Sequence, residues 1–168
     1  MRQIEHQEHR PAPHHGHVVD LILAGLKDPL NVGQAFRTAA SLGVRHVYLC
    51  GGTPTPPGAK INRTARGAQH EVAWSAGTTA TVIEDLQRAG TAVVAVEYAT
   101  KSRDLREVVG GIAPERPIAL VVGHEARGLT PEIMGVCAQV AHLPLYGRVS
   151  SLNVATALAL ALWEVVRR

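Results

Sequence analysis

Short apolar runs alternate along this chain with segments that carry helix signals, and this alternation limits the fold more than any other feature. The runs consist mainly of Val, Leu, Ile and Ala, as expected of strands that are buried on both faces. Glycine stops and Asn or Thr caps mark the helical segments between them. Strands separated by helices form a mainly parallel sheet. The sequence therefore predicts an α/β fold with a mainly parallel sheet flanked by helices, and the predicted strands are 18–26, 47–50, 72–74, 91–98, 117–122 and 140–145.

The composition is that of a globular domain with a sizeable core. Of the 168 residues, 46% are hydrophobic and 18% are charged, and a chain of this length buries most of its apolar surface on folding. No apolar run reaches the roughly 20 residues that a membrane span requires. The polar start of the chain does not resemble a signal segment. We therefore expect one domain over 18–168, a cytoplasmic location and no membrane segment.

The first 17 residues are rich in histidine and differ from the rest of the chain. Both a metal-binding tail and a flexible, solvated arm fit this composition, and the arm is favoured because no ligand spacing recurs. Cys50 and Cys137 lie in apolar stretches, which indicates buried free thiols, and no metal site is expected. The histidines of the predicted arm, 1–17, are His6, His9, His14, His15 and His17.

A helix is predicted directly after the first strand, with Asn31 as its N-cap and Gly43 as its stop after Leu42. Within this helix, Gly33 and Arg37 are four residues apart and share a face. A glycine in the first turn lowers helix stability by about 1 kcal/mol relative to alanine, so its presence needs another reason. Either Gly33 admits the backbone of another molecule beside Arg37, or it packs against a neighbouring part of the chain.

The most apolar helix of the chain, predicted over 151–168, opens with polar residues. Ser150, Ser151 and Asn153 stand at its mouth, where core packing does not require them. Such side chains can cap the helix and leave polar groups that face a cavity.

Three loops with unusual polar residues follow predicted strands: 27–37, 123–129 and 144–153. In open parallel sheets, ligands bind beyond the carboxyl ends of the strands. Because all three loops lie at such ends, we expect them to converge on one site.

These loops carry three motifs, and a fourth segment, 63–68, places Arg63 and Arg66 before Gly67. Exposed arginines there could hold a nucleic-acid backbone or could equally be solvated surface. Together these segments resemble the SpoU (TrmH-type) family of RNA ribose 2′-O-methyltransferases within the SPOUT superfamily. The resemblance covers 18–168, and three motifs in the same order and spacing are specific. The matching segments are Asn31-Val32-Gly33 with Arg37-Thr38-Ala39 and Gly43-Val44, then Val121 to Leu129 (VVGHEARGL), and finally Leu143-Pro144-Leu145 with Ser151-Leu152-Asn153-Val154-Ala155.

The resemblance implies properties that composition and periodicity do not. It implies a deep trefoil knot near the C-terminus, over roughly 117–168, a rare departure from unknotted topology. It also implies that S-adenosylmethionine binds within the knotted loops, and that the protein acts as a homodimer with its site near the subunit interface. The last helix, apolar around much of its girth, fits such a dimer.

The resemblance also assigns roles to residues of this chain, position by position. The polar positions that the family uses for catalysis and site organisation are Asn31, Arg37, Glu125, Ser151 and Asn153. The expected cofactor contacts, largely through backbone groups, are Ala99, Gly123, Leu143 and Leu152. The expected RNA-binding residues are Arg37, Arg63, Arg66 and Arg127.

The family has been assigned an arginine base, which would be Arg37 here, but a guanidinium with a pKa above about 12 is a poor base. We therefore expect Arg37 to bind a phosphate and to stabilise the developing alkoxide, while that phosphate or water removes the proton. For Glu125, a structural role as the hydrogen-bond partner of a loop amide or an arginine is favoured over a role in direct proton transfer. Ser151 and Asn153 are expected to hold the loop and the ribose.

A tRNA is the first choice of substrate, and ribosomal RNA follows closely. Since no separate RNA-binding domain is apparent in the sequence, recognition would rest on the catalytic domain, the dimer groove, the arm or an accessory protein. Two alternative functions remain: a SPOUT base methyltransferase, and a non-catalytic RNA-binding protein that retains the fold. A conventional dinucleotide-binding domain is disfavoured because no G-x-G-x-x-G segment follows a strand.

Overall fold

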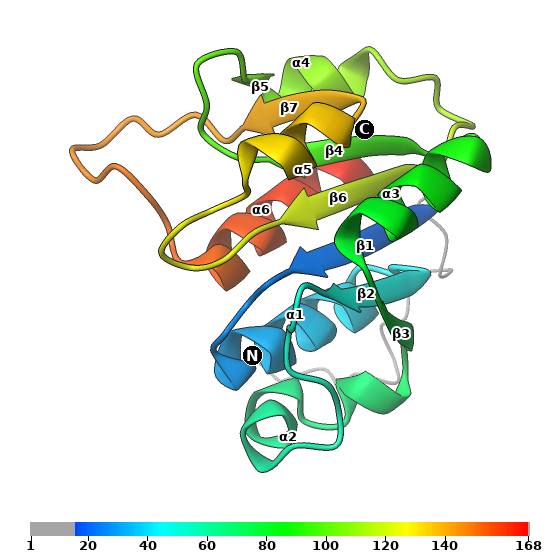
Figure 1. Cartoon of the computed structure of the whole chain (residues 1–168), viewed down its shortest axis with the longest axis vertical. Coiled ribbons are helices and arrows are strands. Elements are labelled where there is room, and N and C mark those ends of the chain that lie inside the picture. Colours follow the sequence, from blue (N-terminus) through cyan, green and yellow to red (C-terminus); the bar gives the residue numbers. More distant parts are fainter. Residues whose placement is uncertain (1–15, 168) are drawn as a thin grey trace, which may run out of the picture.

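The computed structural model describes residues 16–167, which form a sheet between two layers of helices (Figure 1). Within this range, seven strands make one sheet in the order β3-β2-β1-β6-β4-β7-β5. The strands are β1 (Val19–Ala24), β2 (His46–Cys50), β3 (Ala73–Gly77), β4 (Ala92–Val96), β5 (Arg103–Asp104), β6 (Ile118–Val122) and β7 (Gln139–His142). The α-helices are α1 (Pro29–Ser41), α2 (Ala59–Ala65), α3 (Thr79–Arg88), α4 (Leu105–Gly110), α5 (Pro131–Val136) and α6 (Val154–Val166).

Every strand pairing in the described sheet is parallel, which confirms the predicted α/β fold. Side chains alternate between the two faces, so that Leu21 and Leu23 of β1 join one apolar core while Ile22 joins the other. The first core includes residues of α1, α2, α4 and α6, and the second includes α3 and α5. In Figure 1, α3 and α5 lie in front of the sheet and α6 lies behind it.

The first helix begins earlier than the sequence predicted. Its N-cap is Asp28, whose carboxylate accepts a hydrogen bond from the backbone N–H of Leu30 at 2.9 Å, and Pro29 is its first residue. An Asp N-cap followed by Pro suits a helix start better than a cap two residues inside the helix. The prediction of Asn31 as the N-cap was therefore wrong: Asn31 is the third helical residue, and it is buried.

The C-terminal part also differs from the expected boundaries. Strand β7 ends at His142, and α6 begins at Val154 with Asn153 as its N-cap. Residues 143–153 therefore form a long loop, where a longer strand and an earlier helix start were predicted. Helices α2 and α4 were not predicted, because seven and six residues are too few to show a clear helical period.

Further predictions concern the N-terminal arm, the two cysteines and the membrane. Residues 1–15 of the predicted arm lie outside the described residues. Cys50 is buried and Cys137 is partly buried, and both are free thiols, with burial raising the pKa of each to about 11. None of the described helices combines the length and the apolar character that crossing a membrane requires.

Gly33 packs against α2 of its own chain, which decides between the two reasons considered for a glycine at this position. A Cβ atom at Gly33 would stand 2.1 Å from Thr64 Oγ1 and 2.4 Å from the carbonyl oxygen of Ile61. The Thr64 hydroxyl in turn donates to the carbonyl oxygen of Leu30 at 2.9 Å. Only glycine lets α1 and α2 approach this closely, so the position of α2 depends on it.

We expect Gly33→Ala to lower the free energy of unfolding by about 1–3 kcal/mol, because the new methyl group would overlap the backbone of α2. Urea unfolding followed by circular dichroism measures the change. Gly135→Ala is the matched control, since Gly135 also lies in a helix but has open space where a Cβ would stand; it should be neutral or slightly stabilising. Equal stability of Gly33→Ala and the unaltered protein would contradict the packing described.

Candidate functional site

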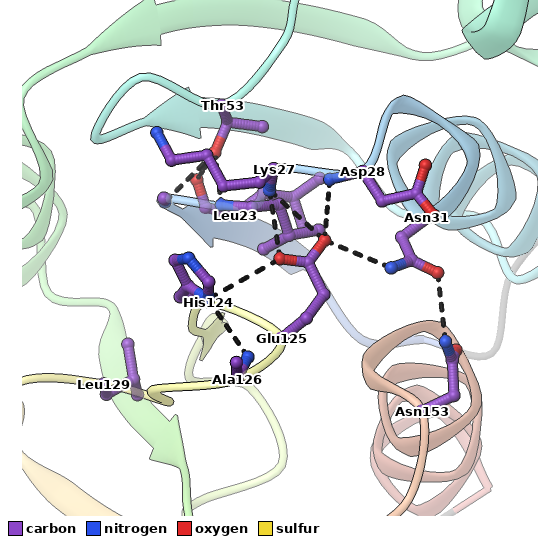
Figure 2. A network of polar contacts seen from close by, with 12 residues as sticks. Leu23, Lys27, Asp28, Asn31, Thr53, His124, Glu125, Ala126, Leu129 and Asn153 are labelled. Atoms are coloured by element: carbon purple, nitrogen blue, oxygen red, sulfur yellow. Dashed lines mark hydrogen bonds and ion pairs between the residues drawn. The ribbon is translucent and has the colours of Figure 1, made fainter.

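The loops that follow β1, β6 and β7 meet at the carboxyl edge of the sheet. In Figure 1 the chain after β6 and the chain after β7 both extend beyond this edge before they turn into the next helix. Figure 2 shows side chains from all three loops joined by hydrogen bonds. The structure thus brings together the three segments that the sequence placed at one site.

Glu125 lies at the centre of these contacts and binds the backbone that leads into α1. Its Oε1 accepts hydrogen bonds from the N–H of Asp28 at 2.9 Å and from Asn31 Nδ2 at 3.1 Å. Its Oε2 accepts from the N–H of Lys27 at 3.0 Å. One carboxylate therefore holds the loop after β6 against the start of α1.

The same hydrogen bonds decide the charge of Glu125. Partial burial disfavours the charged form, but the N–H groups of Asp28 and Lys27 and the Asn31 amide outweigh burial and lower the pKa of Glu125 to about 2. A carboxylate with this pKa is ionised at neutral pH and is a very weak base. The geometry thus favours a role in holding the loop over a role in taking a proton.

Asn31 extends the contacts of Glu125 to α6. Its Nδ2 donates to the carboxylate, which can only accept, so its Oδ1 is left as an acceptor for Asn153 Nδ2 at 3.1 Å. Asn153 Oδ1 in turn accepts from the N–H groups of Ala155 and Thr156, at 2.9 and 3.3 Å, and caps α6. The chain Glu125–Asn31–Asn153 therefore ties the loop after β6 to the first turns of two helices.

The loop after β6 is a tight turn with little room for change. Backbone hydrogen bonds join His124 and Gly128 in both directions, at 3.2 and 2.8 Å. A Cβ at Gly123 would stand 2.5 Å from the backbone of Gly128, so these two segments touch. His124 Nδ1 lies 3.8 Å from Glu125 Oε2 but accepts the N–H of Ala126 at 3.0 Å, which makes this histidine a part of the turn rather than an ion-pair partner.

A cavity of about 360 Å³ opens between the loops after β4, β6 and β7 and the first turns of α6. This volume is in the range of small-molecule sites, and apolar and polar groups share the lining. Among the expected cofactor residues, Gly123, Leu143 and Leu152 line it, as do Glu125, Ser151 and Arg127. Ala99 is not among the lining residues, whereas its neighbours Glu97 and Tyr98 are.

Three polar or aromatic lining residues were not singled out from the sequence: Glu97, Tyr98 and His142. Glu97 Oε2 accepts the N–H of Leu129 at 2.8 Å and so joins the loop after β4 to that after β6. For Glu97 and Tyr98 the available signal was position, since both lie at the carboxyl end of the predicted strand 91–98. His142 falls in the middle of the predicted strand 140–145, and only the structure shows that β7 ends there. Their contacts could not be read from the sequence, because the order of the strands was not predicted.

Arg37 does not reach this cavity. It is exposed on a more open groove of about 660 Å³ between α1, α2 and α6, together with Arg63, Thr64 and Thr156. Ser151, Leu152 and Val154 line the cavity, whereas Ala155 and Thr156 line the groove. The first turn of α6 therefore forms a wall between the cavity and the groove, and Asn153 caps that wall.

Unpaired cations surround this part of the molecule. Cations elsewhere, such as Arg88 and Arg106, form ion pairs with acidic side chains. By contrast, several cations on α1, on or beside α2 and in the loops after β1, β4, β6 and β7 make no side-chain hydrogen bond or ion pair with a described residue. Exposed positive charge of this kind suits a polyanion such as RNA. These cations are Lys27, Arg37, Lys60, Arg63, Arg66, Lys101, Arg127 and Arg148.

Comparison with known proteins agrees with the resemblance seen in the motifs. The sequence model of the SpoU rRNA Methylase family matches residues 19–163. The chain is 33% identical over 158 residues to the 23S rRNA (guanosine-2′-O-)-methyltransferase RlmB of Xanthomonas axonopodis pv. citri, covering 91% of this chain and 60% of that protein. It is 31% identical over 144 residues to the tRNA (guanosine(18)-2′-O)-methyltransferase of Escherichia coli, covering 83% of this chain and 59% of that protein.

A solved structure shows the same likeness in three dimensions. The AdoMet-bound rRNA methyltransferase from Sinorhizobium meliloti superposes with a TM-score of 0.81 at 30% sequence identity, over 89% of this chain and 56% of that one. The chain thus spans about three fifths of the length of the proteins that it resembles.

We expect Glu125→Gln to destabilise the protein at pH 7, because an amide NH₂ would face the N–H groups of Lys27 and Asp28. The pKa of Glu125 is about 2 in the folded protein, against 4.5 for an ordinary glutamate. Its stabilisation is therefore fully present above about pH 4.5 and is lost as the pH falls toward 2. Urea unfolding of both proteins should show a smaller difference at about pH 3 than at pH 7.

The matched control is Glu84→Gln, which alters a carboxylate exposed on α3 with no hydrogen bond to a described residue. It should change the free energy of unfolding by less than about 0.5 kcal/mol at either pH. A difference between Glu125→Gln and the unaltered protein that is the same at both pH values would contradict the role given to this carboxylate.

Proposed function

The chain belongs to the SpoU rRNA Methylase family, and from this membership and the geometry of its site we propose that it is an RNA ribose 2′-O-methyltransferase that uses S-adenosylmethionine. The observation that carries the proposal is the pair of sites on either side of the first turn of α6. One is a cavity for a small molecule, and the other is a groove with unpaired arginines. Relatives of this chain are named for 2′-O-methylation of both ribosomal RNA and tRNA.

The residues of the cavity fit S-adenosylmethionine, which supplies an electrophilic methyl group on a cationic sulfur. The apolar side chains of Leu143, Leu145 and Leu152 suit the adenine ring, and Gly123 also lines the cavity. Glu97 places a carboxylate in the wall, which suits a cationic ligand. We propose that Gly123, Leu143 and Leu152 hold the cofactor; the contact expected at Ala99 remains a prediction.

Arg37 binds the RNA and stabilises charge in this proposal. It lies in the groove beside Arg63, and its guanidinium has no partner among the described residues. A guanidinium there can hold a phosphate with two hydrogen bonds and stabilise the alkoxide that forms when the 2′-hydroxyl loses its proton. Arg63, Arg66 and Arg127 are proposed to bind the backbone of the RNA. The proton leaves to the phosphate or to water, since neither Arg37 nor Glu125 is a suitable base.

Asn31, Glu125 and Asn153 position the site. Their hydrogen bonds fix the first turn of α6 between cofactor and RNA, so that the hydroxyl and the methyl group can align. Ser151 lines the cavity and is exposed, which leaves its hydroxyl available to the ribose. The chemistry of transfer needs alignment more than acid–base strength, and this arrangement supplies alignment.

We also propose a homodimer formed through α6. Leu158, Leu162 and Val165 are buried in the core of the chain itself, whereas Leu160 and Trp163 are 47% and 54% exposed. Large apolar side chains exposed on one helix favour a protein partner. The trefoil knot over roughly 117–168 stays a prediction, as do the cytoplasmic location and the use of an accessory protein for target recognition.

The proposal is tested by incubating the protein with S-adenosylmethionine carrying a labelled methyl group and with total RNA. The RNA is then digested, and its nucleosides are identified by mass spectrometry. We expect the label on a ribose 2′-oxygen. Label on a base would support a base methyltransferase, and cofactor binding without transfer to any RNA would support a non-catalytic protein; either result would contradict the proposal.

Arg37→Ala should lower the rate of methyl transfer by about a hundred-fold, the usual cost of losing one donor to a developing oxyanion. Binding of S-adenosylmethionine, measured by isothermal titration calorimetry, should not change, because Arg37 lies outside the cavity. Arg88→Ala is the control: this arginine is exposed on α3 and pairs with Asp85. An Arg37→Ala variant that transfers methyl groups at the rate of the control would rule out the proposed role.

A further inference from the structure

Tyr98 is the most exposed large apolar side chain in the lining of the cavity. It follows β4, lines the cavity together with Gly123, and is nevertheless 71% exposed. An aromatic ring that lines a cavity and is mostly exposed must lie at its mouth. Such a ring offers one free face to whatever approaches the cavity from outside.

Contacts behind the ring hold Tyr98 in place. Its ring centroid lies 5.0 Å from that of His142, with the planes tilted by 60°. His142 Nδ1 lies 2.9 Å from Ser102 Oγ, and that hydroxyl donates to the carbonyl oxygen of Ala99 at 2.7 Å. Because the Ser102 hydroxyl hydrogen is donated to Ala99, its oxygen acts as the acceptor for Nδ1–H of His142. The backbone N–H of Tyr98 itself is bound by Glu97 Oε1 at 3.0 Å.

Arg127 adds a cation to the same mouth from the neighbouring loop. It lines the cavity, is exposed, and forms no ion pair with a described residue. An aromatic ring and a free guanidinium that line one cavity are the combination with which proteins bind unpaired nucleotides, the ring stacking on a base and the cation holding the backbone.

We propose that Tyr98 is a stacking site for an unpaired base of the bound RNA, and that Arg127 holds the phosphate next to that base. This inference rests on the proposed function, because it places the base beside the nucleotide that is methylated. A base within a duplex has both faces covered by its neighbours, so only an unpaired base can stack on a protein ring. His142 and Ser102 are positioning residues that keep the ring at the mouth before RNA arrives.

We assign the base to the RNA rather than to the cofactor, because a side chain that lines the cavity and is still 71% exposed is accessible to a molecule that arrives from outside. The apolar side chains of Leu143 and Leu152, which line the cavity, are available to the adenine ring of the cofactor. Loss of the Tyr98 ring should therefore weaken RNA binding and leave cofactor binding unchanged.

The test uses a single-stranded RNA of about ten nucleotides that carries one 2-aminopurine, whose fluorescence is quenched when it stacks. Tyr98→Leu should weaken binding by about ten-fold and reduce the quenching, whereas Tyr98→Phe should keep both. Tyr146→Leu is the matched control, because Tyr146 is 94% exposed but does not line the cavity. The same strand annealed to its complement should show no difference between Tyr98→Leu and the unaltered protein.

Two further variants separate the parts of the site. Arg127→Ala should weaken binding, lower the salt dependence by about one phosphate contact, and leave the quenching at saturation unchanged. Ser102→Ala releases His142 and should reduce the quenching less than Tyr98→Leu does. Thermal melting and calorimetry with S-adenosylmethionine serve as controls that test whether each variant is folded and binds the cofactor.

Several results would overturn the proposal. One is equal RNA binding by Tyr98→Leu and Tyr146→Leu. Another is that Tyr98→Leu loses only cofactor binding. A third is that Tyr98→Leu changes the oligomeric state, which would make Tyr98 a subunit contact. If the unaltered protein methylates RNA and Tyr98→Leu does so equally well, only the stacking site fails. If the unaltered protein neither binds nor methylates RNA, the proposed function fails and the stacking site with it.

Discussion

The site depends on one carboxylate that accepts hydrogen bonds from the start of a distant helix. Glu125 binds the N–H groups of Lys27 and Asp28 and the amide of Asn31, residues that are nearly a hundred positions away in the sequence. An ionised acceptor makes a stronger hydrogen bond with an N–H group than a neutral acceptor does. Because Asn31 also binds the cap of α6, the carboxylate fixes three loops at once. Figure 2 shows how few side chains this takes.

This arrangement explains why polar residues precede the most apolar helix. Asn153 caps α6 with its oxygen and reaches Asn31 with its nitrogen, so the end of the helix is held at a set distance from α1. The first turn of α6 then separates the cavity from the groove that contains Arg37. In the proposed reaction the cofactor and the RNA lie on opposite sides of this turn, and its fixed position keeps the two aligned.

Much of the fold could be predicted, because apolar runs and cap residues act locally. Thr130 caps α5 and Pro131 is its first residue, a pair that the preferences for helix starts recognise from the sequence, and the rule for carboxyl ends of parallel strands grouped the correct loops. The prediction of Asn31 as an N-cap failed because Asp28 and Asn31, both suitable cap residues, stand three residues apart. The helix begins at the earlier of the two, where Pro29 follows Asp28. The wall between Arg37 and the cavity, and the contact of Tyr98 with His142, could not be predicted, since both depend on strand order and on partners far along the chain.

Asn31 and Asn153, joined by a hydrogen bond, should act as one unit between the cavity and the groove. A double-mutant cycle on the rate of methyl transfer, with Asn31→Ala, Asn153→Ala and the double variant at saturating cofactor, tests it most directly. If the two amides act together, the double variant should be about as slow as the slower single variant, with a coupling of at least about 1 kcal/mol. Effects that multiply would show that the two residues act independently, so that their hydrogen bond does not align the site.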